Sequence, residues 1–178
     1  MSCFISSGIS LGCSDGVGSL KKIYIVGGGG SVTGYTYNAD GAITGATSTT
    51  GTTLYGFEIK RNTSSLTQNV QKNFENSSIF FDQVLSVVFY KYDQDKRNEL
   101  KILSQNDELQ IIAIDQNNVQ YLLGQVNGMY LSGGNASTGT ALADGNKFTL
   151  EFMGNEPEPA NVIVGALSAV FTGASIVG

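Results

Sequence analysis

Four consecutive glycines follow an apolar segment in the stretch KIYIVGGGGSVTG at 22–34. A strand that runs into glycines is typical of dinucleotide sites, where the pattern G-x-G-x-x-G holds a pyrophosphate at a helix N-terminus. No register of that pattern fits, because Val32 or Thr33 replaces the third glycine, or Ser31 the second. The following residues also lack a helical apolar period. We therefore interpret the run as a glycine loop between two strands and expect no nucleotide cofactor.

The chain contains no histidine, which is the commonest general base and metal ligand. Nucleophile schemes that pair serine or cysteine with histidine are excluded. The Asp-x-Asp at 93–95 is not a calcium loop, because Lys96 and Arg97 occupy the positions of a later ligand and of the turn glycine. We expect no catalytic residue, no metal site and no cofactor, so we do not expect an enzyme.

The two cysteines, Cys3 and Cys13, are too few for a disulfide framework, and no C-x-x-C pair suggests zinc. The stretch SLGC at 10–13 resembles a lipoprotein processing site, but the residues before it lack the basic and apolar regions of a signal peptide. We therefore expect free thiols and synthesis in the cytoplasm.

The segment from Val162 to Val177 is apolar but shorter than the roughly 20 residues that a membrane helix needs. We expect no membrane span here. The segment is instead predicted to be a buried strand, or a surface that becomes covered only when a partner subunit binds.

The composition is that of a turn-rich β protein, with 23 glycines, 2 prolines and only 14% charged residues among 178. The length suffices for one domain with a sizeable core. The net charge of −5 argues against tight binding to a phosphate backbone, which requires clustered lysine and arginine.

Apolar alternation and short apolar runs predict strands at 19–26, 54–61, 64–76, 79–92 and 146–154, and a hairpin at 109–126. One helix is predicted at about 94–106, capped by Asp93 and anchored to the core by Leu100 and Leu103. The stretch 27–53 is predicted as a long loop or loose hairpin, and 128–146 as a second long loop.

The predicted fold is therefore mainly β: an antiparallel β-sandwich or partly closed barrel with one flanking helix, long inter-strand loops and extended termini. We expect a single domain. It would comprise an N-terminal arm at 1–18, a β core with the helix at 19–160 and an apolar C-terminal segment at 161–178.

Four segments carry a resemblance to a known family. They are GCSDGVGSLKKIYI, SSLTQNVQKNFENSSIFFDQVLSVVF, DKRNELKILSQNDELQIIAIDQNNVQYLLG and GMYLSGGNASTGTALADGNKFTLEFMGNEPEPA. In their order and texture, across residues 9–160, they resemble the tail tube (major tail) proteins of tailed bacteriophages that infect Bacteroidota-type bacteria.

The resemblance implies a virion structural protein that is assembled in the cytoplasm of the bacterial host and located in the phage tail. Its copies would form hexameric rings whose inner strands join into one β-barrel, and the rings would stack through the long loops and terminal arms. DNA would pass through the lumen without specific binding. The other partners implied are the tape measure, terminator and baseplate proteins of the tail.

Within this picture, the strands at 64–76 and 79–91 are the natural candidates for the inner barrel. The residues expected to face the lumen are Asn69, Gln71, Asn73, Glu75 and Asp82. The residues expected to pack between subunits are Val84, Val88, Val162, Ile163 and Val164. Strand parity directs Lys72 to the side opposite the lumen.

Two alternative functions remain open at this point. A capsid decoration protein or adhesin-like β-sandwich would act as a binding module, and Tyr35, Tyr37 and Tyr130 are the aromatic candidates for its loop tips. A tube protein of a contractile injection system would share the same assembly physics.

Overall fold

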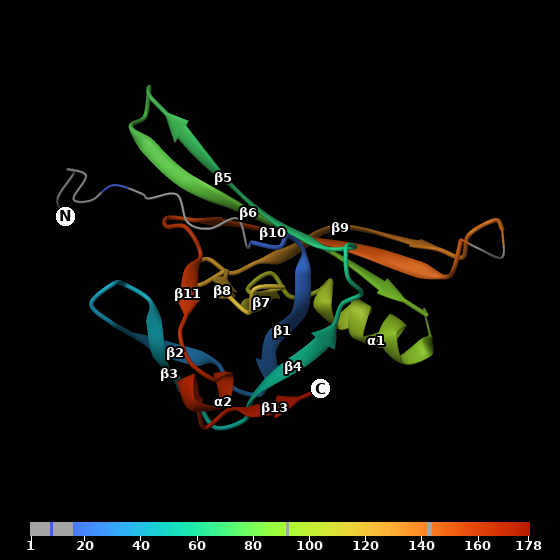
Figure 1. Cartoon of the computed structure of the whole chain (residues 1–178), viewed down its shortest axis with the longest axis horizontal. Coiled ribbons are helices and arrows are strands. Elements are labelled where there is room, and N and C mark those ends of the chain that lie inside the picture. Colours follow the sequence, from blue (N-terminus) through green and yellow to red (C-terminus); the bar gives the residue numbers. More distant parts are fainter. Residues whose placement is uncertain (1–7, 9–15, 92, 142–143) are drawn as a thin grey trace.

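The computed structural model describes residues 8, 16–91, 93–141 and 144–178 and shows a mainly β, sandwich-like fold (Figure 1). Two sheets lie against each other, and helix α1 (Gln94–Leu103) packs at the side where they meet. The predicted fold class is confirmed, and no closed barrel forms within the described part of the chain. Most of the predicted N-terminal arm lies outside the described residues.

The larger sheet, sheet A, is mixed rather than purely antiparallel. Its strand order is β12-β3-β11-β8-β7-β1-β4-β13, and β2 pairs with β3. The bounds are β1 (Leu20–Gly28), β2 (Val32–Tyr37), β3 (Ile43–Ser48), β4 (Thr52–Glu58), β7 (Ile111–Asp115), β8 (Gln120–Leu123), β11 (Asn161–Ile163), β12 (Phe171–Thr172) and β13 (Ser175–Val177). β11 and β12 run parallel to β3, and β13 runs parallel to β4, so the C-terminal segment supplies every parallel pair that the structure describes.

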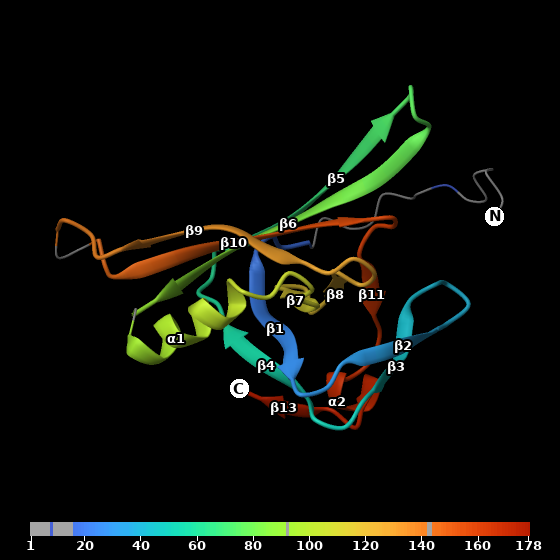
Figure 2. The same ribbon diagram turned by 180° about the vertical axis from the view of Figure 1, so that it is seen from behind.

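Sheet B has four strands in the order β5-β6-β10-β9, and all neighbours are antiparallel. Its bounds are β5 (Ser65–Asn73), β6 (Ser78–Tyr90), β9 (Tyr130–Ser137) and β10 (Lys147–Glu156). The β5–β6 hairpin and the β9–β10 hairpin project beyond the body in opposite directions (Figures 1 and 2).

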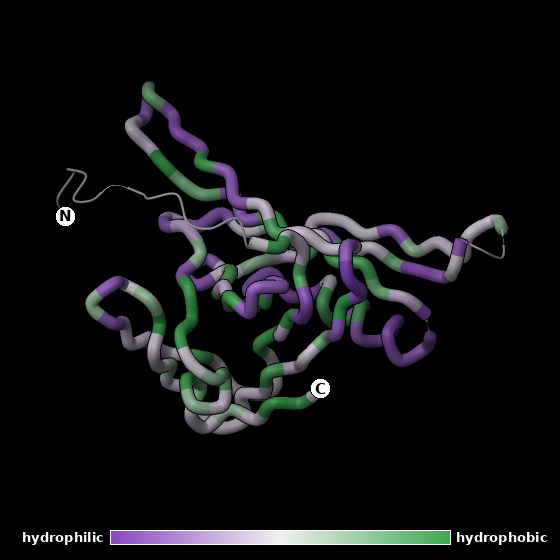
Figure 3. The backbone as a smooth tube through the Cα atoms, in the orientation of Figure 1, coloured by the Kyte–Doolittle hydropathy of each residue, from purple (hydrophilic) through white to green (hydrophobic). Residues whose placement is uncertain are grey.

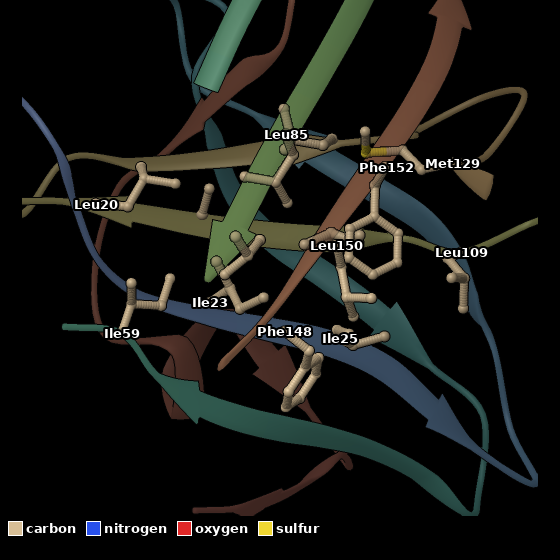
Figure 4. Close-up of a cluster of buried hydrophobic side chains, with 14 residues drawn as sticks. Leu20, Ile23, Ile25, Ile59, Leu85, Leu109, Met129, Phe148, Leu150 and Phe152 are labelled. Atoms are coloured by element: carbon tan, nitrogen blue, oxygen red, sulfur yellow. The ribbon is translucent and has the colours of Figure 1, made fainter. Parts of the chain in front are cut away.

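The main core lies between the two sheets (Figure 4). Ile23 and Ile25 of β1 contribute to it from sheet A, and Leu85 of β6 contributes from sheet B. Strand β10 adds three buried side chains to the same cluster, those of Phe148, Leu150 and Phe152. These positions alternate along each strand, as expected where one face of a strand is buried.

A second apolar cluster covers the opposite face of sheet A. Ile112 and Leu122 belong to it, whereas their neighbours Ile111 and Leu123 face the main core. The C-terminal segment supplies much of the cover, since Leu167 and Val170 of the short helix α2 (Leu167–Val170) are buried there. Figure 3 shows this segment as a largely hydrophobic stretch folded along the body. The prediction of one buried strand was wrong, because the segment forms three short strands and the helix α2, and its last strand, β13, is exposed. The chain itself still covers Ile163, Leu167, Val170 and Phe171.

Helix α1 begins where the sequence predicts and ends slightly earlier, at Leu103. The carboxylate of Asp93 accepts a hydrogen bond from the backbone N–H of Lys96, at 3.0 Å, as an N-cap does. Leu100 and Leu103 pack against the main core as predicted, although neither is fully buried.

Two stretches predicted as loops are largely strands. The stretch 27–53 contains the β2–β3 hairpin, which confirms the hairpin alternative, and 128–146 contains β9. The prediction of a long loop at 128–146 was wrong, because β9 gains its order from pairing with β10 rather than from apolar side chains of its own.

Candidate assembly surface

Sheet B has one face toward the core and one face away from it, which we call the outer face. Leu85 and Val87 are buried in the core, so the even-numbered residues of β6 point outward. The register pairs Asn69 with Asp82, which places the odd-numbered residues of β5 on the same outer face. Figures 1 and 2 show no described helix or strand lying over it.

Four of the five predicted lumen residues gather on this outer face. The amide of Gln71 donates a hydrogen bond to the carboxylate of Asp82, with 2.9 Å between Nε2 and Oδ2. Asn69 lies directly opposite Asp82. Asn73 ends β5, and its side-chain oxygen accepts a hydrogen bond from the backbone N–H of Glu75 at 2.9 Å.

Glu75, the fifth predicted residue, lies in the turn between β5 and β6 rather than in a strand. It therefore occupies the tip of the hairpin. Lys72 is on the opposite face from Gln71 and Asn73, as parity predicts, and its ammonium lies 5.0 Å from the ring centroid of Phe74.

The remaining outer-face positions are mostly polar and carry few charges. The register places these further polar residues on it: Ser65, Thr67, Ser86, Asn135, Lys147, Thr149, Glu151 and Asn155. The strand segments of this face therefore hold two carboxylates, Asp82 and Glu151, and one ammonium, that of Lys147. A phosphate backbone would meet no basic cluster on these strands.

Val84 and Val88 also point outward, and both are half-buried. Their cross-strand neighbours in β10 are Met153 and Thr149. Farther along β6, Phe80 lies on the same face and is 37% exposed. These side chains form small apolar points on the largely polar face that also carries Asp82. One face therefore holds residues predicted to line the lumen and residues predicted to pack between subunits.

The C-terminal residues predicted to pack between subunits divide into two kinds. Ile163 is only 3% exposed and belongs to the chain's own second core cluster, so that prediction was wrong for Ile163. Val164 is 52% exposed and Val162 is half-buried. The sequence showed an apolar segment, but it could not show that sheet A itself provides the cover.

We call the outer part of the β5–β6 hairpin, residues 69–82, the arm. Its underside continues the core-facing side of the strands beyond the body, with Val70 60% exposed and Phe81 half-buried. Ile79 is exposed on the same side, and Phe74 at the tip is 81% exposed. The arm therefore carries a mostly polar outer side and an underside on which Val70 and Ile79 are exposed beside Lys72.

Both edges of sheet B are unpaired within the described residues, because β5 pairs with β6 and β9 pairs with β10. β9 has the sequence YLSGGNAS, without a charge or a proline, and carries one irregularity opposite Glu151 and Phe152. Natural proteins usually protect edge strands with charges, prolines or covering elements. The β9 edge is therefore a natural position for a further strand.

A carboxylate holds the chain just beyond β9. Asp144 accepts hydrogen bonds from the backbone N–H groups of Ala141, at 2.8 Å, and Thr140, at 2.9 Å. These bonds and the hydroxyl of Thr140 lower the pKa of Asp144 below its ordinary value. The charged carboxylate therefore fixes Thr140 and Ala141 at neutral pH.

A polar network connects the β2–β3 hairpin to the rest of sheet A. The hydroxyl of Tyr35 donates to the side-chain oxygen of Gln110 at 3.0 Å, and the amide of Gln125 donates to the hydroxyl of Tyr37. Burial, and then the neighbouring Tyr37, raises the pKa of Tyr35 well above its ordinary value. These tyrosines bond within the chain, which makes them poor candidates for the loop-tip aromatics of a binding module.

The glycine run that resembled a nucleotide site ends β1 and leads into β2, so the position where a helix would have to begin holds another strand. A groove of about 530 Å³ adjoins it, lined in part by Gly28, Gly30, Glu108 and Asn127. The helix N-terminus that would hold a pyrophosphate is absent at this described position.

Comparisons of the chain with protein-family models, with curated proteins and with solved structures find no match. Among the residues that the structure describes, no three or more acidic or cysteine side chains gather as a metal site would require. No helix within the described ranges has the length and hydrophobicity to cross a membrane.

Proposed function

We propose that this chain is a virion structural protein that assembles edge to edge through sheet B into stacked rings, forming the tail tube of a tailed bacteriophage. We base the proposal on the edges and the outer face of sheet B. Within the described residues it combines two unpaired edges, a polar outer face without a basic cluster, and an arm that extends past the body.

The strand directions support closure into a ring. The order β5-β6-β10-β9 is antiparallel throughout, so β5 and β9 run in opposite directions. When β9 of one copy joins β5 of the next copy in the same orientation, the alternation continues across the junction. Such a head-to-tail contact generates a ring when the rotation from copy to copy closes, and a closed ring removes the exposed edges of sheet B.

The expected dimensions agree with a conduit. A hexameric ring contains about 24 strands, and at the usual strand spacing and tilt its backbone diameter is about 45 Å. The outer face of sheet B then lines the lumen, with Asp82 and Glu151 directed toward it. Carboxylates repel phosphates, and neutral polar groups do not attract them by charge. DNA can therefore pass through the lumen without being held.

A decoration protein or adhesin-like module is less well supported, because two of its three candidate aromatics, Tyr35 and Tyr37, are engaged within the chain and only Tyr130 is left as an exposed candidate. The tube of a contractile injection system uses the same ring geometry. We commit to the phage tail because of the sequence resemblance.

Negative-stain electron microscopy of the purified protein, over a range of concentrations and salt, tests the assembly. We expect rings or tubes with a central hole wide enough for duplex DNA. Dispersed single particles under every condition, together with a monomer mass in sedimentation, would contradict the proposal and favour a binding module.

Two neighbouring proline substitutions in β9 test the edge specifically. Successive residues of a strand direct their N–H groups to opposite edges, so one of Asn135→Pro and Ala136→Pro removes a bond to β10 and the other blocks only the free edge. We expect one of the two variants to keep the thermal stability of the parent protein and yet form no rings. If both variants formed normal rings, β9 would not be part of the interface between copies.

A further inference from the structure

The surface opposite the arm contains an apolar groove beside α1. Its volume is about 510 Å³, and it lies between α1 and strands β1, β4 and β13. Its lining includes Tyr55, Phe57, Ile102, Leu103 and Val177. Ile102 is 61% exposed, although it lies on a helix that packs against the core, and Tyr55 and Val177 are also exposed. Isolated exposed apolar residues are ordinary, but several lining one groove mark a contact surface.

One carboxylate on the groove forms no ion pair within the described residues. Glu99 lines the groove, and the one ion pair in the described part of the chain joins Lys96 to Asp93. The groove thus offers an apolar floor with the carboxylate of Glu99 on the α1 side, while the ammonium of Lys22 lies on the β13 side and donates to the carbonyl of Gly178.

The tip of the arm has the complementary chemistry. Phe74 is the most exposed of the large apolar side chains that the structure describes. The ammonium of Lys72 lies over its ring and forms no ion pair within the described residues. An aromatic side chain buries roughly 150–250 Å² of surface when it enters a pocket, and the groove is large enough to receive it.

We propose that the arm tip of one copy docks in the α1 groove of a second copy, with Phe74 inserted beside Ile102 and Lys72 paired with Glu99. This inference rests on the proposed self-assembly and specifies a contact separate from the two edges of sheet B. The arm and α1 lie at opposite sides of the molecule (Figure 1), so the arm tip of a chain cannot reach the α1 groove of the same chain. The contact joins two different surfaces and therefore repeats from copy to copy.

Disulfide trapping tests the contact directly. In a background with Cys3→Ser and Cys13→Ser, one preparation carries Phe74→Cys and the other carries Ile102→Cys. Both changed positions are exposed, so the fold of each monomer is expected to persist. Mixing the two under oxidising conditions is expected to give a disulfide-linked dimer at several times the yield of a control mixture. The control replaces Phe74→Cys with Ala39→Cys, an exposed position in the turn between β2 and β3.

Charge reversal provides a second readout. Lys72→Glu and Glu99→Lys are each expected to raise the concentration needed for assembly several-fold, and the double variant is expected to restore it. Electron microscopy distinguishes failure of the arm–groove contact from failure of the proposed assembly. Rings or tubes without trapping above the control would overturn the arm–groove contact and leave the proposed function standing. A protein that stays monomeric at every concentration would overturn both.

Discussion

Tyr35 shows how a single half-buried side chain connects stability to pH. Its raised pKa means that the folded protein holds the phenol proton more tightly than the unfolded chain, whose tyrosine pKa is about 10. The stabilisation is complete below that pH and is lost as the pH rises through 10 toward the folded pKa. We expect the free energy of unfolding to fall by up to about 1.4 kcal/mol per pH unit above pH 10.

Urea unfolding at pH 8 and pH 11 measures this effect in the parent protein and in Tyr35→Phe. The variant lacks the titrating group and should show a smaller loss between the two pH values. Equal losses in the two proteins would show that other groups account for the alkaline sensitivity.

At the scale of elements, α1 depends strongly on its cap, because none of its residues is fully buried. The backbone N–H of Lys96, and then its ammonium, lowers the pKa of Asp93. The cap therefore stabilises α1 above the ordinary pKa of 3.8, and this contribution is lost as the pH falls through the lower folded value. We expect Asp93→Ala to speed amide hydrogen exchange in the first turn of α1 at neutral pH.

Asp95→Asn is the matched control for this experiment. It removes a carboxylate from the same turn without removing the cap hydrogen bond. Comparable exchange rates in the two variants would mean that charge near the helix N-terminus, rather than the cap, maintains the turn.

At the scale of the whole molecule, residues 161–178 are part of the fold and not an appendage. Ile163, Leu167, Val170 and Phe171 are all buried. Burying side chains of this size stabilises a protein by about 1.5–3 kcal/mol each, which together approaches the total stability of a typical domain. We expect deletion of 161–178 to give an unfolded or insoluble chain, as judged by circular dichroism and solubility.

Deletion of 175–178 provides the comparison, because every residue in that stretch is exposed. The shorter deletion should keep a cooperative thermal transition. A soluble, cooperatively folded product from the longer deletion would show that sheet A does not need the segment.

From the sequence we could predict the elements whose own side chains show a regular apolar pattern or a helix cap. The strong apolar alternation of β6 and β10 and the cap at Asp93 were sufficient for two strands and the helix. β9 was missed because Gly133 and Gly134 give it no apolar period, and its order comes from pairing with another strand. The α1 groove was missed for a related reason, since Ile102 and Val177 meet only after folding.

β11 lies between β3 and β8, so the β2–β3 hairpin joins the rest of sheet A through residues that are made much later than the hairpin. Pairing over such a separation is slow, because the chain must close a long loop before it gains any contact. Sheet B is complete by residue 156 and needs none of this segment. We therefore expect sheet B to form before sheet A closes, so a partly folded chain presents both free edges of sheet B to other partly folded chains.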